Sequence, residues 1–283
     1  MSAKRPLLLF LALLPLLVQA QSPWPRSKAG FYAQAAWHFI PAYEELFSAF
    51  DGLDAYPLDR ELNENTFQLY GEYGLTRKTT LLASIPVRFL KAGRFLNNFA
   101  TPETQEGTLT ALGNVSLGVR QALIEGNLRL TGSLRIDLPA SQYDDATGLS
   151  AGYDAWTLQP TLSTGMGFGR AYWFAYAGYG WRSRGFSGVI DAGVEGGVRI
   201  KSVWLIGFSQ WLHSLKDGDV ALPVHNRLTG LYVDRQQWLS IGVKGIVEFN
   251  RFWGVVVSAA GAADGEWVPK RPGFGVGAYF KWD

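Results

Sequence analysis

Apolar and polar side chains alternate along several stretches of the chain, and the pattern is clearest at 127–140, NLRLTGSLRIDLPA. Leu130 and Leu134 share one parity of positions, whereas Arg129 and Arg135 share the other. A period of two predicts a β-strand with one apolar and one polar face. The apolar face would contact a second sheet in a soluble sandwich, or lipid in an outer-membrane barrel. In the barrel, the charged face would line a lumen.

The same alternation divides the chain into twelve strand-like segments. Each is about as long as the roughly 9–11 residues that cross a bilayer at a tilt. The segments are 29–40, 64–75, 79–90, 110–123, 128–138, 154–167, 171–182, 188–200, 203–213, 236–249, 252–263 and 273–282.

The connections between these segments alternate between short and long. The tight turns are 76–78, 124–127, 168–170, 201–202 and 250–251. The long, polar connections are 41–62, 91–109, 141–153 and 214–236, and two shorter ones lie near 183–187 and 264–272. Outer-membrane barrels have short periplasmic turns and long extracellular loops, whereas a soluble sandwich has no reason to sort its loops by side. We therefore predict an all-β, up-and-down antiparallel barrel of twelve strands with both termini periplasmic.

The first twenty residues have the features of a secretory signal peptide. A basic start at Lys4 and Arg5 precedes an apolar run from Leu7 to Val18, and the segment ends in Ala20. Cleavage is predicted before Gln21. An uncleaved anchor is the alternative, but the apolar run is shorter than the roughly 20 residues of a spanning helix. The predicted organisation is a signal peptide at 1–20 and one barrel domain at 21–283.

Composition supports export and a membrane barrel. The chain has no Cys, which excludes a lipid anchor on cysteine and a disulfide framework. The residues after the leader carry 24 basic and 24 acidic side chains, a balance that argues against a nucleic-acid partner. Aromatic residues near strand ends suit interfacial girdles. They are Trp37, Tyr73, Trp156, Trp173, Trp204 and Trp253.

The last strand alternates apolar side chains, several of them aromatic, from Phe274 to Trp282. It looks like the C-terminal signal read by the barrel assembly machinery, although Asp283 departs from the usual aromatic end. We expect the outer membrane of a Gram-negative bacterium as the location. The expected partners are outer-membrane lipid, the assembly machinery and a small-molecule solute.

In such a barrel the polar parity places charged side chains in the lumen. They could form a structural ladder of ion pairs that stiffens the wall, or a selectivity lining for a pore. The predicted lumen-lining residues are Glu72, Arg88, Arg120, Arg129, Arg135, Asp137, Asp191, Glu195, Arg199, Lys244 and Glu248.

No residue pattern predicts a catalytic, cofactor-binding or metal site. His38, His213 and His225 lack ligand spacing with one another. A lipid-modifying barrel enzyme, such as an outer-membrane phospholipase, remains the alternative. It would need a His and a Ser two residues apart on one strand face, whereas Ser214 follows His213 directly. A structural or adhesive barrel is the third possibility.

Two features could bear on solute passage. Pro86 and Pro160 interrupt predicted strands, as bulges or as a kink that opens the wall to lipid; we favour bulges. The first long loop carries a patch of helical spacing, YEELFSAF at 43–50. An exposed apolar patch needs a partner, so the patch would either form an apolar mouth or cap its neighbours. The predicted mouth residues are Tyr43, Leu46, Phe47 and Phe50, with Tyr56 nearby.

Residues 66–200 resemble a family of proteobacterial outer-membrane proteins named for the meta-pathway of phenol degradation. ALGNVSLGVRQAL at 111–123 looks like the family's Gly-Asp-x-x-Leu-Gly-x-Arg strand, with Asn114 in place of Asp. LRIDLPASQY at 134–143 and AYAGYGWRSRG at 175–185 are similar to two further family stretches. The resemblance implies a transporter barrel that takes up small apolar or aromatic compounds, and it assigns no ligand residue.

Overall fold

A computed structural model describes residues 21–98, 101–140 and 142–282. The predicted signal peptide at 1–20 and the C-terminal Asp283 lie outside these ranges. Strands dominate the described chain. Their bounds are β1 (Phe31–Phe47), β2 (Ala55–Gly74), β3 (Thr79–Phe95), β4 (Gly107–Leu112), β5 (Ser116–Ile124), β6 (Leu128–Asp137), β7 (Tyr143–Asp144), β8 (Leu149–Ser150), β9 (Thr157–Phe168), β10 (Ala171–Arg182), β11 (Val189–Ile200), β12 (Val203–Ser214), β13 (Gln237–Glu248), β14 (Trp253–Glu266) and β15 (Gly273–Trp282).

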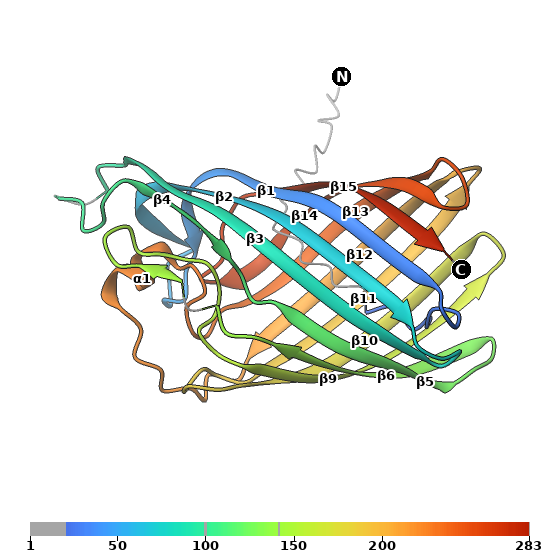
Figure 1. The fold of residues 1–283 in the computed structure, drawn as a ribbon. Helices are drawn as coiled ribbons and strands as arrows, with labels where there is room; N and C mark the ends of the chain where they lie inside the picture. Colours follow the sequence, from blue (N-terminus) through green and yellow to red (C-terminus); the bar gives the residue numbers. More distant parts are fainter. Residues whose placement is uncertain (1–20, 99–100, 141, 283) are drawn as a thin grey trace, which may run out of the picture.

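All of these strands except β7 and β8 close into one antiparallel barrel (Figure 1). β1 pairs with β2 on one side and with β15 on the other, so the first and last strands seal the sheet. β4 and β5 both pair with β3 and together occupy one position in the wall, which gives a barrel of twelve strands in the described part of the chain. β7 and β8 form a small separate hairpin in the loop after β6. The predicted fold class is confirmed.

Tight turns and long loops lie at opposite ends of the barrel. The turns after β2, β5, β9, β11 and β13 gather at the right end of Figure 1, near the C-terminus. The loops and the short helix α1 (Val224–Thr229) gather at the left end, called the loop end below. α1 stops at Gly230, whose left-handed backbone packs against Leu46; a Cβ there would lie 2.3 Å from Leu46 Cδ1. No residue pattern predicted this helix.

Strand parity separates an apolar outer face from a polar lumen. Leu134 and Ile136 are each 41% exposed on the outside of β6, whereas Asp137 is buried on the inside. A soluble protein rarely leaves a continuous apolar band exposed around its whole wall, so this band faces lipid. The apolar face of NLRLTGSLRIDLPA therefore contacts acyl chains. No helix in the described ranges is long and apolar enough to cross a membrane.

The first predicted loop is the largest departure from expectation. β1 runs on to Phe47 and β2 starts at Ala55, so most of 41–62 is strand and the helical interpretation of 43–50 is wrong. Register shifts lie between Ile40 and Tyr43, and again between Tyr43 and Glu45. Bulges break the period of two and leave Ile40, Tyr43 and Leu46 facing inward at intervals of three. In the sequence, this spacing resembles that of the apolar residues on one face of a helix.

A bulge also accompanies Pro86. Val87 pairs with Leu112 of β4 and Ser84 with Ser116 of β5, so three residues, 113–115, lie opposite two. The Gly113 N–H donates to the Pro86 carbonyl across 2.9 Å, which closes the gap that the missing proline N–H would leave. At Pro160 the pairing with β10 lapses for two residues on each strand, with no inserted residue.

Candidate functional site

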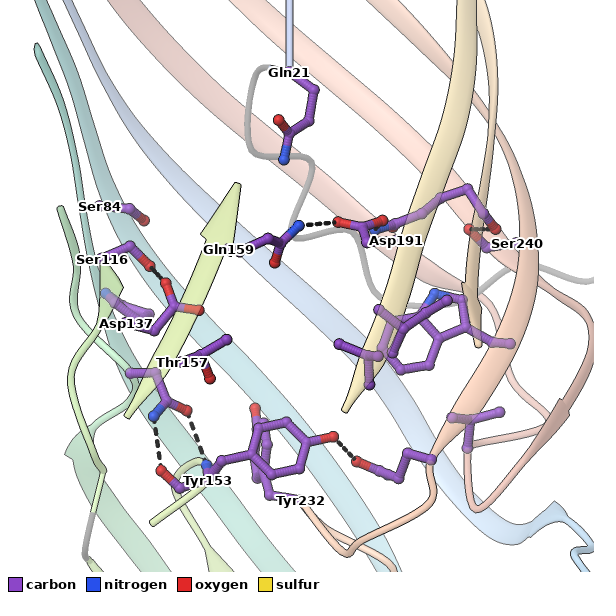
Figure 2. Close-up of a pocket in the computed structure, with 18 of the residues that line it drawn as sticks. Gln21, Ser84, Ser116, Asp137, Tyr153, Thr157, Gln159, Asp191, Tyr232 and Ser240 are labelled. Carbon is purple, nitrogen blue, oxygen red and sulfur yellow. Dashed lines mark hydrogen bonds between the residues drawn. The ribbon is translucent and has the colours of Figure 1, made fainter. Parts of the chain in front are cut away.

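A cavity of about 240 Å³ occupies the barrel lumen below the loop end. Its lining combines side chains from strands on all sides with Tyr153 and Tyr232 from the loops (Figure 2). Gln21, at the start of the described chain, also borders it. The cavity is therefore bordered by the barrel wall, by the loops and by residues 21–30, which precede β1 and are called the N-terminal segment below.

Hydrogen-bonded carboxylates form the polar part of the cavity wall. Asp191 accepts hydrogen bonds from Gln159 Nε2 at 3.0 Å and from Gln210 Nε2 at 2.9 Å, and Figure 2 shows the first of these. Asp137 accepts from Ser116 Oγ at 2.6 Å, and Arg135 Nε lies 3.0 Å from the same carboxylate. These side chains come from five strands, so only closure of the barrel brings them together.

The N-terminal segment extends into the lumen towards this cavity. Trp24 makes edge contacts with the rings of Tyr172 and Phe174 on β10, at centroid distances of 5.7 and 6.1 Å. Arg26 Nε lies 2.5 Å from Glu72, and Glu72 also pairs with Arg120 at 3.4 Å. Because Glu72 and Arg120 are only 3% and 2% exposed, this three-residue cluster fastens the segment to the inner wall.

The remaining predicted lumen residues divide between the interior and the turn-end rim. Glu195 pairs with Lys244 at 2.9 Å and accepts the Tyr172 hydroxyl at 2.6 Å. Glu248 pairs with Arg199 at 2.6 Å and with Lys281 at 2.8 Å near the tight turns, where the Arg199 side chain is 44% exposed. Arg129 is half-buried near the turn after β5, and it forms no ion pair within the described chain.

Arg88 is the last of the predicted lumen residues. It belongs to a cluster of two arginines and two tyrosines that sequence reasoning missed. The guanidinium of Arg182 lies 4.1 Å from the ring centroid of Tyr153, and Tyr153 meets Tyr232 edge-on at 5.3 Å. The guanidinium of Arg88 lies 5.3 Å from the Tyr232 ring. Two cations therefore bracket a pair of tyrosines, an arrangement that the ring quadrupoles favour. All four side chains border the cavity.

Both tyrosine hydroxyls stay protonated at neutral pH. Burial raises the pKa of Tyr153 above its ordinary value, and the nearby Arg182 opposes part of that rise. Burial likewise raises the pKa of Tyr232, with Arg88 in opposition. The Tyr153 hydroxyl donates to Gln236 Oε1 at 2.6 Å, and Gln236 Nε2 donates to the carbonyls of Gly230 and Trp267. Tyr153 is thus fixed by a neutral hydrogen bond to an anchored glutamine.

Some missed residues carried a sequence signal and others did not. Arg182 and Glu64 lie on the inward parity of their strands, so the alternation that selected Glu72 could have selected them. Tyr153 and Tyr232 lie in loops, where no periodicity indicates which side chain turns inward. Trp24 precedes the first strand, and its position depends on contacts with β10.

The four predicted mouth residues lie at the loop end, with different exposures. Tyr43 and Leu46 are buried, and they border the cavity. Phe47 packs against the buried cluster that contains them, and Phe50 is 54% exposed beside Tyr56 and Trp267. This cluster, called the loop-end core below, consists of Ile40, Tyr43, Leu46, Leu58, Leu62, Leu90, Ala92, Leu149, Leu231, Ala262 and Val268.

Neither His213 nor His225 forms a nucleophilic site with Ser214. His213 lies on the outward parity of β12 and stacks on Trp211 at 5.2 Å, whereas its neighbour Ser214 is buried. His225 Nδ1 contacts the Asp145 carbonyl in the loops at 2.6 Å. Among residues 21–98, 101–140 and 142–282, no group of three or more His, Cys, Asp or Glu side chains could hold a metal ion.

Comparison with solved structures identifies the kind of barrel. The COG4313 outer membrane channel from Pseudomonas putida F1 superposes with a TM-score of 0.71 at 13% identity, covering 94% of this chain and 100% of that one. The NanC porin gives a TM-score of 0.52 at 7% identity, covering 89% and 100%. At these identities the likeness shows a shared outer-membrane barrel fold. No family model matches the sequence, and no curated protein matches it.

Proposed function

We propose that this chain is a passive channel in the outer membrane of a Gram-negative bacterium and that it conducts small apolar or aromatic solutes. One observation carries the proposal: the lumen holds a cavity whose walls include the rings of Tyr153, Tyr232, Phe174 and Phe208. Aromatic and aliphatic walls with a few placed polar groups are the usual lining of a small-molecule site.

The channel role is supported by the fold, because the two solved barrels described above are a channel and a porin. The solute class is supported by the residues. Twelve strands enclose a much narrower lumen than the sixteen to eighteen of general porins. The N-terminal segment and the loop-end core narrow the lumen further, and both present apolar side chains to it. The resemblance of 66–200 to the phenol meta-pathway family points to the same solutes.

Transport can be tested in proteoliposomes with lipopolysaccharide in the outer leaflet, which slows unassisted diffusion of apolar solutes. Protein-dependent uptake of benzyl alcohol should exceed that of arabinose, a sugar of similar size. Protein-free vesicles supply the background rate for each solute. Faster sugar than aromatic uptake, or no increase over the background, would contradict the proposed function.

The lipid-modifying alternative predicts hydrolysis of phospholipid in the same vesicles. His213 and Ser214 lie on opposite faces of β12, with Ser214 buried, so this pair gives that activity no support. Fatty-acid release by the purified protein that disappears in a His213→Ala variant would favour the enzyme over the channel.

A further inference from the structure

Two arginines on the cavity wall hold buried N–H groups that nothing in the described chain accepts. Arg88 is only 6% exposed; its Nη1 donates to Thr66 Oγ1 at 2.9 Å, but its Nε has no acceptor. Arg182 has neither an Nε nor an Nη1 acceptor within the described ranges. Buried donors of a charged group without acceptors are costly and rare in folded proteins.

The carboxylates that border the cavity are already satisfied. Glu64 accepts the Tyr43 hydroxyl at 2.6 Å, and Glu195 is held by Lys244. Asp137 and Asp191 have the partners given above. None of these four acids therefore needs a cation from a ligand. In contrast, N–H donors of Arg88 and Arg182 on the cavity wall still lack a hydrogen-bond partner within the described chain.

The surroundings of the two arginines favour an apolar or aromatic ligand body. Arg182 and Arg88 lie at the two ends of the Tyr153–Tyr232 pair, so ring surface and guanidinium groups border the same space. Apolar wall is supplied by Phe174 on the same strand as Arg182 and by Phe208 and Leu212 on β12. An inorganic anion would make no apolar contact with that surface. A neutral aromatic ligand would offer the guanidinium N–H donors no charged acceptor.

We propose that the cavity binds small organic anions, namely carboxylates on an apolar or aromatic body, with the Nε and Nη1 donors of Arg182 holding the carboxylate and Arg88 adding positive charge from the far end of the tyrosine pair. This proposal names the ligand class of the same lumen and rests on the proposed channel function. Arginine suits this role because its fixed fork of donors matches the two oxygens of a carboxylate.

The test uses three fluorinated probes of nearly equal size that differ in head-group charge: 4-fluorobenzoate, 4-fluorobenzyl alcohol and 4-fluorobenzylamine. Binding to the purified chain in detergent is followed by ¹⁹F NMR, with empty micelles as the blank. We expect the anion to bind at least about ten-fold more tightly than the alcohol, since a charged hydrogen bond contributes that much. The amine should bind most weakly.

Variants of the two arginines then test which side chain binds the carboxylate. Arg182→Gln should weaken binding of the benzoate about ten-fold and leave the alcohol unchanged, whereas Arg88→Gln, at the far end of the tyrosine pair, should weaken it less. Arg184→Gln is the matched control, because Arg184 is exposed and pairs with Asp154 in the loops. The comparison of the three probes on the unaltered chain needs no variant, so it decides the question even if a variant does not fold.

Equal affinity for the anion and the alcohol, or tighter binding of the amine, would overturn the inference. So would an Arg184→Gln effect as large as that of Arg182→Gln. Aromatic uptake without a preference for the anion removes this inference and leaves the channel proposal standing. Selective anion binding without any uptake contradicts the channel proposal and leaves the ligand class standing.

Discussion

At the scale of single residues, the lumen depends on buried charges that are matched locally. Glu72 lies between Arg26 and Arg120 and is almost inaccessible to solvent. Replacing Glu72 by Gln removes the negative charge from two neighbouring guanidiniums. We expect a loss of about 3 kcal/mol in the free energy of unfolding, measured by urea titration in lipid or detergent.

The matched control for that variant is Glu125→Gln at the turn after β5. Glu125 pairs with Lys78 on the surface, where solvent screens both charges, so the loss should stay below about 1 kcal/mol. Equal losses for the two variants would show that burial of the Glu72 cluster does not matter to stability.

Trp24 is the residue whose removal should alter passage most directly. Its indole packs against Tyr172 and Phe174 inside the lumen. A Trp24→Ala variant opens space beside β10, so arabinose uptake in proteoliposomes should increase several-fold. Trp253→Ala, an exposed indole on the outward face of β14, should leave the rate unchanged. An unchanged sugar rate in Trp24→Ala would mean that the N-terminal segment does not limit flow.

At the scale of strands, the cost of a charge on the outer face should depend on its depth in the bilayer. Leu162 lies in the middle of β9 and is 57% exposed to lipid, whereas Leu128 begins β6 beside a tight turn. Leu162→Arg should lower the free energy of unfolding in lipid vesicles by about 2–4 kcal/mol, and Leu128→Arg by about 0–1 kcal/mol. The same cost at both sites would contradict the membrane placement inferred from strand parity.

At the scale of the whole molecule, closure of β1 on β15 predicts a barrel that resists detergent. The unheated protein should migrate faster on a denaturing gel than the boiled protein, because the closed sheet stays compact until heat opens it. Extraction from cells should require detergent, since the outer face is apolar around the wall. A chain that remained soluble and monomeric without detergent would refute a membrane barrel.

Much of the barrel follows from local pattern. The predicted ranges 171–182 and 128–138 match β10 and β6 to within a residue at each end. In each case the alternation also fixed which side chains face inward, because a strand's period of two is a property of its own sequence. Loop lengths fixed which turns share an end. Where bulges interrupt the period, as between Ile40 and Leu46, local pattern failed and a strand looked like a helix.

Local alternation therefore predicts most of the strands, their two faces and the polarity of the lumen. It does not predict which inward side chains meet, because closure and stagger of the barrel bring together residues far apart in the chain. Glu72 meets Arg26 and Arg120 from 46 and 48 positions away. Tyr153 and Tyr232 enter from separate loops to lie between Arg182 and Arg88. No periodicity encodes such contacts, since they depend on the curvature of the whole sheet and on loops that fold back over its end.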